Sequence, residues 1–105
     1  MMKEPRTIDI TSRIQSEETF VLYGYAPICA NCQIAERMLD IVSEMKGFSY
    51  TSINLNYHKD LIELYEIRSA PALLLFRKGR LIREVYAFQS VTHLTEVFDE
   101  FLVDE

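Results

Sequence analysis

The chain has 105 residues, of which 49% are hydrophobic and 26% charged, and its net charge is −5 at pH 7. This length is enough for one domain, expected to span residues 1–105, and folding should bury roughly 65% of the surface of the unfolded chain. The composition excludes disordered, collagen-like and low-complexity chains. The acidic balance disfavours nucleic acids and anionic membranes as partners, because both bind to basic patches.

No stretch of the sequence resembles a membrane span. The longest apolar runs, such as residues 70–76, are far shorter than the ~20 residues that a spanning helix needs. The charged N-terminus is followed by no apolar stretch, so we expect no signal peptide and a cytoplasmic location. Two cysteines are too few for a disulfide scaffold.

The first half of the chain predicts two strand–helix units and a third strand. In chain order we expect a strand at 7–10, a weak helix at 11–18, a buried strand at 20–25, a helix at 31–46 and a strand at 48–55. The helix at 31–46 has apolar residues at helical spacing on one face, namely Ile34, Met38, Ile41, Val42 and Met45. Gly47 follows it, as is typical of a helix C-terminus.

The second half predicts a helix, a hairpin and a last helix. Asn56 is a candidate N-cap for a helix at 57–65, which we expect to bury Leu61, Leu64 and Tyr65. The continuous apolar run 72–76 is typical of a central strand covered on both faces. The turn 77–80 joins it to a strand at 81–88. Ser90 is placed to cap a final helix, whose apolar face consists of Val91, Leu94, Val97, Phe98, Phe101 and Leu102.

The predicted order is therefore β-α-β-α-β-α-β-β-α, which indicates the α/β class. Strands that alternate with helices favour a mixed, mostly parallel central sheet, to which the late hairpin adds an antiparallel edge. Helices must then cover both faces of this sheet.

The most informative motif is Cys29-Ala30-Asn31-Cys32, which follows a predicted buried strand and opens the long helix. A thiol at a helix N-terminus is close to unpaired backbone N–H groups and to the positive end of the helix dipole, and both favour the thiolate. Cys32 lies one turn further on the same side and is more enclosed. This arrangement suits two-step exchange, in which Cys29 attacks a disulfide and Cys32 then attacks Cys29.

The two cysteines have two simpler interpretations. They could be two small buried hydrophobes, although their place at a helix start after a proline turn argues against this. They could belong to a zinc site, but such a site needs two further ligands, and only His58 and His93 remain. Both histidines are expected at the surface. We therefore expect no metal, and no cofactor beyond a redox-active disulfide.

Two blocks of sequence resemble the thioredoxin family, and together they span most of the chain. One is FVLYGYAPICANC at 20–32, and the other is YEIRSAPALLLFRKG at 65–79, similar to the family's segment around a cis-proline. The resemblance implies a thioredoxin-like fold with Pro71 in cis against the redox turn. It also implies that the backbone of Ala70 and Pro71 pairs with an extended substrate.

The chain departs from the family pattern at several positions. Ile28 replaces the tryptophan before the first cysteine, where the family contacts its substrate, and Ala87 replaces a glycine of the substrate groove. Tyr23 and Ser52 replace a buried aspartate and its lysine partner, which in the family help to deprotonate the second cysteine. With no carboxylate nearby in sequence, we expect Cys32 to resolve mixed disulfides slowly at pH 7.

The resemblance implies a thiol–disulfide oxidoreductase that reduces disulfides in protein substrates, with a thioredoxin reductase as a possible electron donor. We expect a monomer. An alternative is a binding module that holds a partner protein in the cis-proline groove, with slow or regulatory redox chemistry. A glutathione-using, glutaredoxin-like enzyme is disfavoured, because no Gly-Gly pair follows the strand after the proline.

Overall fold

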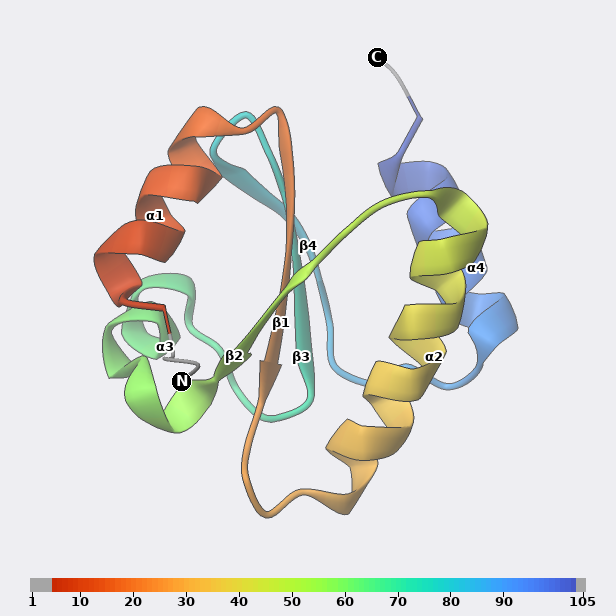
Figure 1. Cartoon of the computed structure of the whole chain (residues 1–105), viewed down its shortest axis with the longest axis horizontal. Helices are drawn as coiled ribbons and strands as arrows, with labels where there is room; N and C mark the ends of the chain where they lie inside the picture. Colours follow the sequence, from red (N-terminus) through yellow and green to blue (C-terminus); the bar gives the residue numbers. More distant parts are fainter. Residues whose placement is uncertain (1–4, 104–105) are drawn as a thin grey trace.

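A computed structural model of the chain describes residues 5–103 and contains one sheet with helices on both sides (Figure 1). Residues 1–4, where we expect no signal peptide, lie outside the described residues. The helices are α1 (Thr7–Ser16), α2 (Ala30–Lys46), the 3-10 helix η1 (Leu55–Tyr57), α3 (Lys59–Tyr65) and α4 (Val91–Phe101). The strands are β1 (Thr19–Tyr25), β2 (Thr51–Asn54), β3 (Ala72–Arg77) and β4 (Arg80–Val85).

The sheet has the strand order β2-β1-β3-β4, so the two apolar strands β1 and β3 are central. Only β1 and β2 are parallel, whereas β3 is antiparallel to both β1 and β4. The prediction of a mixed sheet in an α/β fold is confirmed, but "mostly parallel" is wrong. The segment that contains α3 connects β2 to β3 and reverses the direction of the chain. As a result, β3 lies beside β1 and runs antiparallel to it.

The predicted strand at 7–10 is also wrong, because this segment is the first part of α1. An alternating strand would place Ile8 and Ile10 on one face, yet Ile8 is exposed and Ile10 is buried. Ile10 and Ile14 are instead buried four residues apart, which is the spacing of one helix face. The β-branched residues of this segment are typical of a strand. The segment is nevertheless helical, because a helix buries both Ile10 and Ile14 against the sheet.

The predicted helix at 31–46 is confirmed, and Gly47 ends it in the left-handed conformation with a φ of 76°. Its buried face is not the predicted one, since Ile34, Ile41 and Met45 are exposed and only Met38 and Val42 turn inward. The buried residues of α2 are Cys32, Ala35, Leu39 and Val42. Two of these, Ala35 and Cys32, are too small to stand out in a hydrophobic pattern.

Two predicted caps have different outcomes. Ser90 is the N-cap of α4, and its side chain accepts a hydrogen bond from the His93 backbone N–H at 3.0 Å, as predicted. Asn56 is not the cap of α3. The side chain of Asn54 accepts from the Asn56 N–H and starts η1, and α3 begins later with His58 as its N-cap. In α3, Leu61 is buried as predicted, but Leu64 is exposed.

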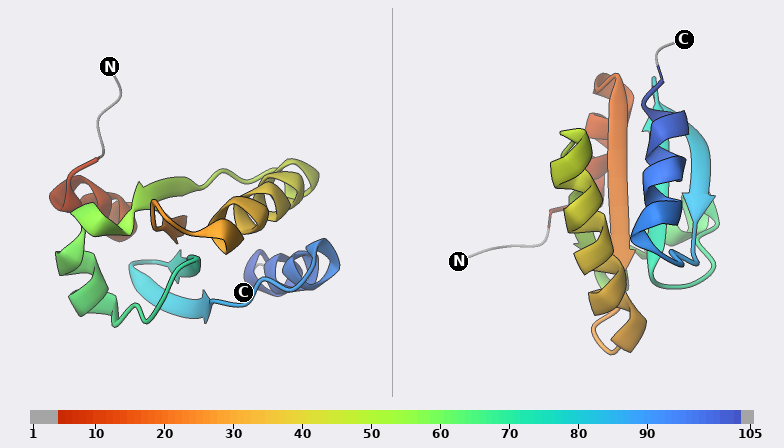
Figure 2. Two further views of the ribbon diagram at one scale, coloured as in Figure 1. Left: turned by 90° about the horizontal axis from the view of Figure 1, so that it is seen from below. Right: turned by 90° about the vertical axis from the view of Figure 1, so that its right-hand side faces the viewer.

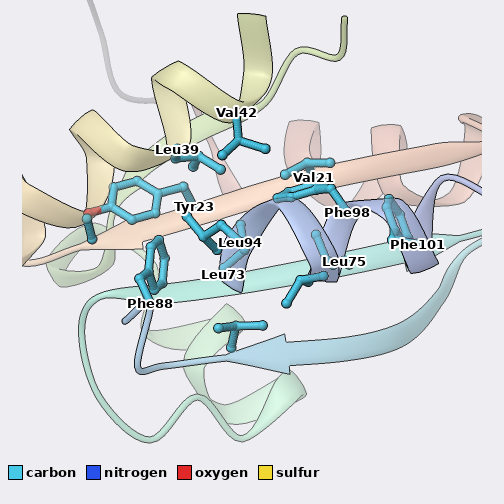
Figure 3. Packing of buried hydrophobic residues seen from close by; sticks show 13 residues of the cluster. Val21, Tyr23, Leu39, Val42, Leu73, Leu75, Phe88, Leu94, Phe98 and Phe101 are labelled. Atoms are coloured by element: carbon cyan, nitrogen blue, oxygen red, sulfur yellow. The ribbon is translucent and has the colours of Figure 1, made fainter. Parts of the chain in front are cut away.

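The sheet separates two hydrophobic clusters. Helices α1 and α3 cover one face, and α2 and α4 lie side by side on the other (Figures 1 and 2). An ion pair between Lys46 and Asp99 connects the end of α2 to α4. Tyr23 of β1 and Phe88 lie at one end of the cluster between the sheet and helices α2 and α4 (Figure 3).

Candidate redox site

Cys29 and Cys32 form a disulfide at the start of α2, with their Cα atoms 5.3 Å apart. Cys29 is the N-cap residue in extended conformation, directly after β1 and the turn at 26–28, and its carbonyl accepts a hydrogen bond from the Cys32 N–H at 3.2 Å. Cys29 is half-buried, whereas only 4% of Cys32 is exposed. The predicted place of the pair at a helix start, with Cys32 the more enclosed, is confirmed.

Tyr23 lies directly behind the second cysteine. Its ring is fully buried, and its hydroxyl donates a hydrogen bond to the backbone carbonyl of Cys32 at 2.6 Å. The ring packs against Tyr25, Tyr50 and Phe88, with centroids 6.0 to 6.5 Å away. Tyr23 is therefore a core aromatic residue whose hydroxyl has a hydrogen-bond partner, and its contact with Cys32 is to the backbone.

The phenol of Tyr23 is a hydrogen-bond donor, and it is a poor base. Burial raises its pKa above the ordinary value of about 10, and the charge of Glu36 raises it further. Ser52 is the register partner of Tyr23 on the neighbouring strand. The two positions that depart from the family's proton-handling pair are therefore adjacent in space, and neither side chain is a carboxylate or an amine.

The Ala70–Pro71 peptide bond is cis, as predicted. Pro71 is buried and shares a shallow groove of about 230 Å³ with the start of α2 and the segment after β4. The groove is lined by Asn31, Ile34, Ala35, Met38, Pro71, Tyr86, Ala87, Phe88 and Gln89. Ala70 is half-buried just before it. The groove thus connects the cis-proline to the first turns of the helix that begins with the redox pair.

Ile28 is 98% exposed immediately before Cys29. A large apolar side chain in water has no stabilising role in the fold, but it adds apolar surface beside the half-buried cysteine. Of the residues predicted for substrate binding, Pro71 lies in the groove, Ala70 adjoins it, and Ile28 stands at the redox turn.

A second cavity, of about 210 Å³, opens on the other side of the pair. Tyr25, Ala26, Pro27, Cys29, Cys32, Gln33 and Glu36 line it. The expectation that no carboxylate is near Cys32 is therefore wrong. Glu36 lies four residues after Cys32 on α2, so one helical turn brings it to the same side. This spacing was the available sequence signal, but a glutamate on a helix is ordinarily a surface residue.

Hydrogen bonds hold Glu36 in place. The hydroxyl of Tyr50 is 3.0 Å from Glu36 Oε2 and 2.6 Å from Asp40 Oδ1. Burial, followed by the hydrogen bonds and charges of these two carboxylates, raises the pKa of Tyr50, so this phenol remains protonated and able to donate. Two acidic side chains of α2 are thereby attached to the segment that leads into β2.

The histidines differ from expectation in one respect. His58 is not at the surface: it is 1% exposed, and its Nδ1 is 3.1 Å from Thr7 Oγ1, which links the start of α3 to the start of α1. His93 is half-buried in the first turn of α4. Within residues 5–103, no group of three or more His, Cys, Asp or Glu side chains is arranged to hold a metal ion.

None of the helices in the described part of the chain is long and apolar enough to cross a membrane.

The thioredoxin family model matches residues 6–100. The thioredoxin-like protein YusE of Bacillus subtilis is 36% identical over 85 residues, which cover 80% of each chain. A thioredoxin of Staphylococcus aureus is 26% identical over 96 residues, covering 90% of this chain and 91% of the relative. In fold, the structure is similar to a mutant thioredoxin from Halobacterium salinarum, with a TM-score of 0.81 at 20% identity, covering 94% of this chain and 88% of the other.

Proposed function

Because this chain belongs to the thioredoxin family and has its cysteine pair at the start of α2, we propose that it reduces disulfide bonds in protein substrates. Thiol–disulfide oxidoreductase chemistry follows from the family and the pair. The choice of protein disulfides as substrates is the proposal. The observation that supports it best is the pairing of a half-buried Cys29 with a buried Cys32 beside an apolar groove.

In the proposed reaction, the thiolate of reduced Cys29 attacks one sulfur of a substrate disulfide, and the other substrate sulfur leaves with the electron pair. Cys32 then attacks Cys29 Sγ, which breaks the mixed disulfide, forms the Cys29–Cys32 bond and releases the second substrate thiol. The substrate gains two electrons, and the pair loses two. Exposure supports these roles, since an incoming disulfide can reach Cys29 more easily than Cys32.

The groove beside Pro71 is the proposed place for the substrate chain. The backbone of Ala70 and Pro71 would pair with an extended peptide, and the exposed Ile28 would contact apolar residues next to the substrate cysteine. The proposal includes a monomer in the cytoplasm, with a thioredoxin reductase supplying electrons to the disulfide.

Insulin reduction by dithiothreitol tests this proposal. Wild-type protein should accelerate the precipitation of the insulin B chain, and Cys29→Ser should remove the acceleration. A Cys32→Ser variant should retain lysate proteins as mixed disulfides that dithiothreitol releases, whereas Cys29→Ser should retain none in this way. If wild type gives no acceleration over dithiothreitol alone, the reductase is rejected.

The alternative is a binding module that uses the same groove. Its supporting observation is the replacement of the proton-handling pair by Tyr23 and Ser52, both of which suit packing. It predicts partner proteins that Cys29→Ser retains as well as wild type does, and that dithiothreitol does not release.

A further inference from the structure

Glu36 is the one carboxylate among the described residues that line the cavity shared by Cys29 and Cys32. The cavity, at about 210 Å³, is large enough for water molecules, and its lining includes the polar residues Tyr25, Gln33 and Glu36. Cys32 and Glu36 thus border the same space. Neither Lys, Arg nor His is among the described residues of this lining.

The carboxylate is positioned by a contact outside the cavity. The Tyr50 hydroxyl lies between Glu36 Oε2 and Asp40 Oδ1, and its single proton can be donated to one of them at a time. Glu36 is half-buried, and Asp40 is exposed. Of these two acidic residues, only Glu36 is in the lining of the cavity shared with the cysteines.

The titratable groups around Glu36 come from three parts of the fold. Tyr23 and Tyr25 face it from β1, and Tyr50 faces it from the segment before β2. On its own helix the groups are Cys32 and Asp40, with Cys29 at the N-cap. The pKa values of Tyr23 and Tyr50 are raised by burial first and by acidic neighbours second, so these phenols keep their protons at neutral pH. A base for Cys32 must therefore be a carboxylate or solvent.

We propose that Glu36 is the proton acceptor for Cys32 when the mixed disulfide is resolved, acting through water in the shared cavity. Glu36 thereby helps to deprotonate Cys32, which the phenol of Tyr23 cannot do. The inference rests on the proposed exchange function and names a further residue for it.

The step balances as follows. The Cys32 thiol gives its proton to a cavity water, which passes a proton to the Glu36 carboxylate. The Cys32 thiolate attacks Cys29 Sγ, the Cys29–substrate bond breaks, and the substrate sulfur leaves with the electron pair. The proton on Glu36 then passes to the substrate thiolate, or to solvent while solvent protonates the thiolate, and either route returns Glu36 to its carboxylate form.

Stopped-flow reaction with the aromatic disulfide 5,5′-dithiobis(2-nitrobenzoate) tests this step. Attack by Cys29 releases one coloured thiolate, and resolution by Cys32 releases a second, so one absorbance trace separates the two steps. Cys32→Ser should show the first phase alone, which assigns the phases.

The decisive variant is Glu36→Gln, and the matched control is Asp40→Asn. Both remove one carboxylate that bonds Tyr50 from the same helix, but only the first removes a group from the cavity lining. At pH 7 we expect Glu36→Gln to slow the second phase about a hundredfold and to leave the first phase unchanged, since a positioned base contributes at least about that factor. Asp40→Asn should change the second phase less than about twofold.

The pH profile excludes a merely structural effect. Between pH 6 and 8 the wild-type second phase should vary little, whereas in Glu36→Gln it should rise about tenfold per pH unit, as hydroxide replaces the missing base. Equal second-phase rates in wild type and Glu36→Gln would overturn the inference. So would equal slowing by both variants, or slowing of the first phase in Glu36→Gln.

This assay does not depend on protein substrates. If both phases appear in wild type but insulin is not reduced, the proposed function fails and the role of Glu36 stands. If insulin is reduced and Glu36→Gln has the wild-type pH profile, the role of Glu36 fails and the function stands.

Discussion

The two cysteines are only three residues apart, yet their surroundings differ. Cys29 is the extended N-cap residue at the edge of the fold, and Cys32 lies within the first turn of α2, against the sheet. Access to reagents should follow this difference. Reduced protein treated with limiting iodoacetamide at neutral pH should therefore be alkylated first at Cys29, as read by peptide mass mapping. Prior labelling of Cys32 would reverse the proposed roles.

The hydrogen bond from Tyr23 to the Cys32 carbonyl holds the first turn of α2 onto β1. Tyr23→Phe keeps the ring and removes the bond, so it should lower the free energy of unfolding by about 1 kcal/mol in urea. Tyr57→Phe is the control, because Tyr57 is 71% exposed and should change stability by less than about 0.5 kcal/mol. If Tyr23→Phe is as stable as wild type, this hydrogen bond does not contribute to the free energy of unfolding.

At the scale of single residues, the sequence was most informative where a local signal has one physical meaning. The cysteine pair after a buried strand and Pro71 before an apolar run could both be predicted. Glu36 and His58 could not, because a polar residue on a helix or in a turn is ordinarily exposed. Their environments come from contacts with Tyr50 and Thr7, which are distant in the chain.

Among the elements, α2 was predicted with nearly correct ends and an incorrect face. The buried stripe begins with two small residues, Cys32 and Ala35, and the exposed isoleucines gave the stronger hydrophobic signal. The predicted weak helix at 11–18 overlaps the second part of α1, but the first part was missed for a related reason, since two buried isoleucines are too few to outweigh a β-branched start. Strand β3 was predicted almost to the residue because all of its side chains from Ala72 to Phe76 are buried.

A pair of substitutions checks the buried face of α2. Leu39 is fully buried and Ile41 is 49% exposed. Leu39→Ala should therefore lower the free energy of unfolding by about 2–5 kcal/mol, through lost burial and a cavity. Ile41→Ala should cost less than about 1 kcal/mol, because its side chain already contacts water. Urea unfolding measures the stability of both variants. A larger loss for Ile41→Ala than for Leu39→Ala would support the buried face predicted from the sequence.

For the molecule as a whole, we expect the buried tyrosines to make stability fall at alkaline pH. Burial raises the pKa of both Tyr23 and Tyr50 in the folded state. Below about pH 10 both folded and unfolded chains keep these protons, and the stability is fully present. Above it the unfolded chain ionises first, so stability should fall by up to about 1.4 kcal/mol per pH unit for each such tyrosine.

Urea unfolding at several pH values above neutrality, with the disulfide intact, measures this decline. The double variant Tyr23→Phe/Tyr50→Phe should be less stable than wild type at neutral pH and should lose less stability as the pH rises. An equal alkaline slope in wild type and the double variant would assign the decline to other groups.

The sheet topology was the part of the whole molecule that the sequence predicted least well. Alternating strands and helices favour parallel pairing, and nothing local distinguishes a right-handed crossover from the return that sets β3 antiparallel to β1. Each of these strands contributes side chains to both hydrophobic clusters, and burial on both faces does not distinguish the two directions.

The exposure of Ile28 makes its position suitable for a fluorescent probe, as in an Ile28→Trp variant. The chain contains no tryptophan, so its native fluorescence comes from its six tyrosines. An indole introduced at Ile28 would be the only one in the protein and would stand in water next to Cys29, without disturbing any packed neighbour. Its emission could be excited apart from that of the tyrosines, and we expect it to differ between the disulfide and the dithiol because Cys29 is the next residue in the chain. The opening and closing of the Cys29–Cys32 bond could then be followed continuously, in a mixture with any substrate and without a chemical label.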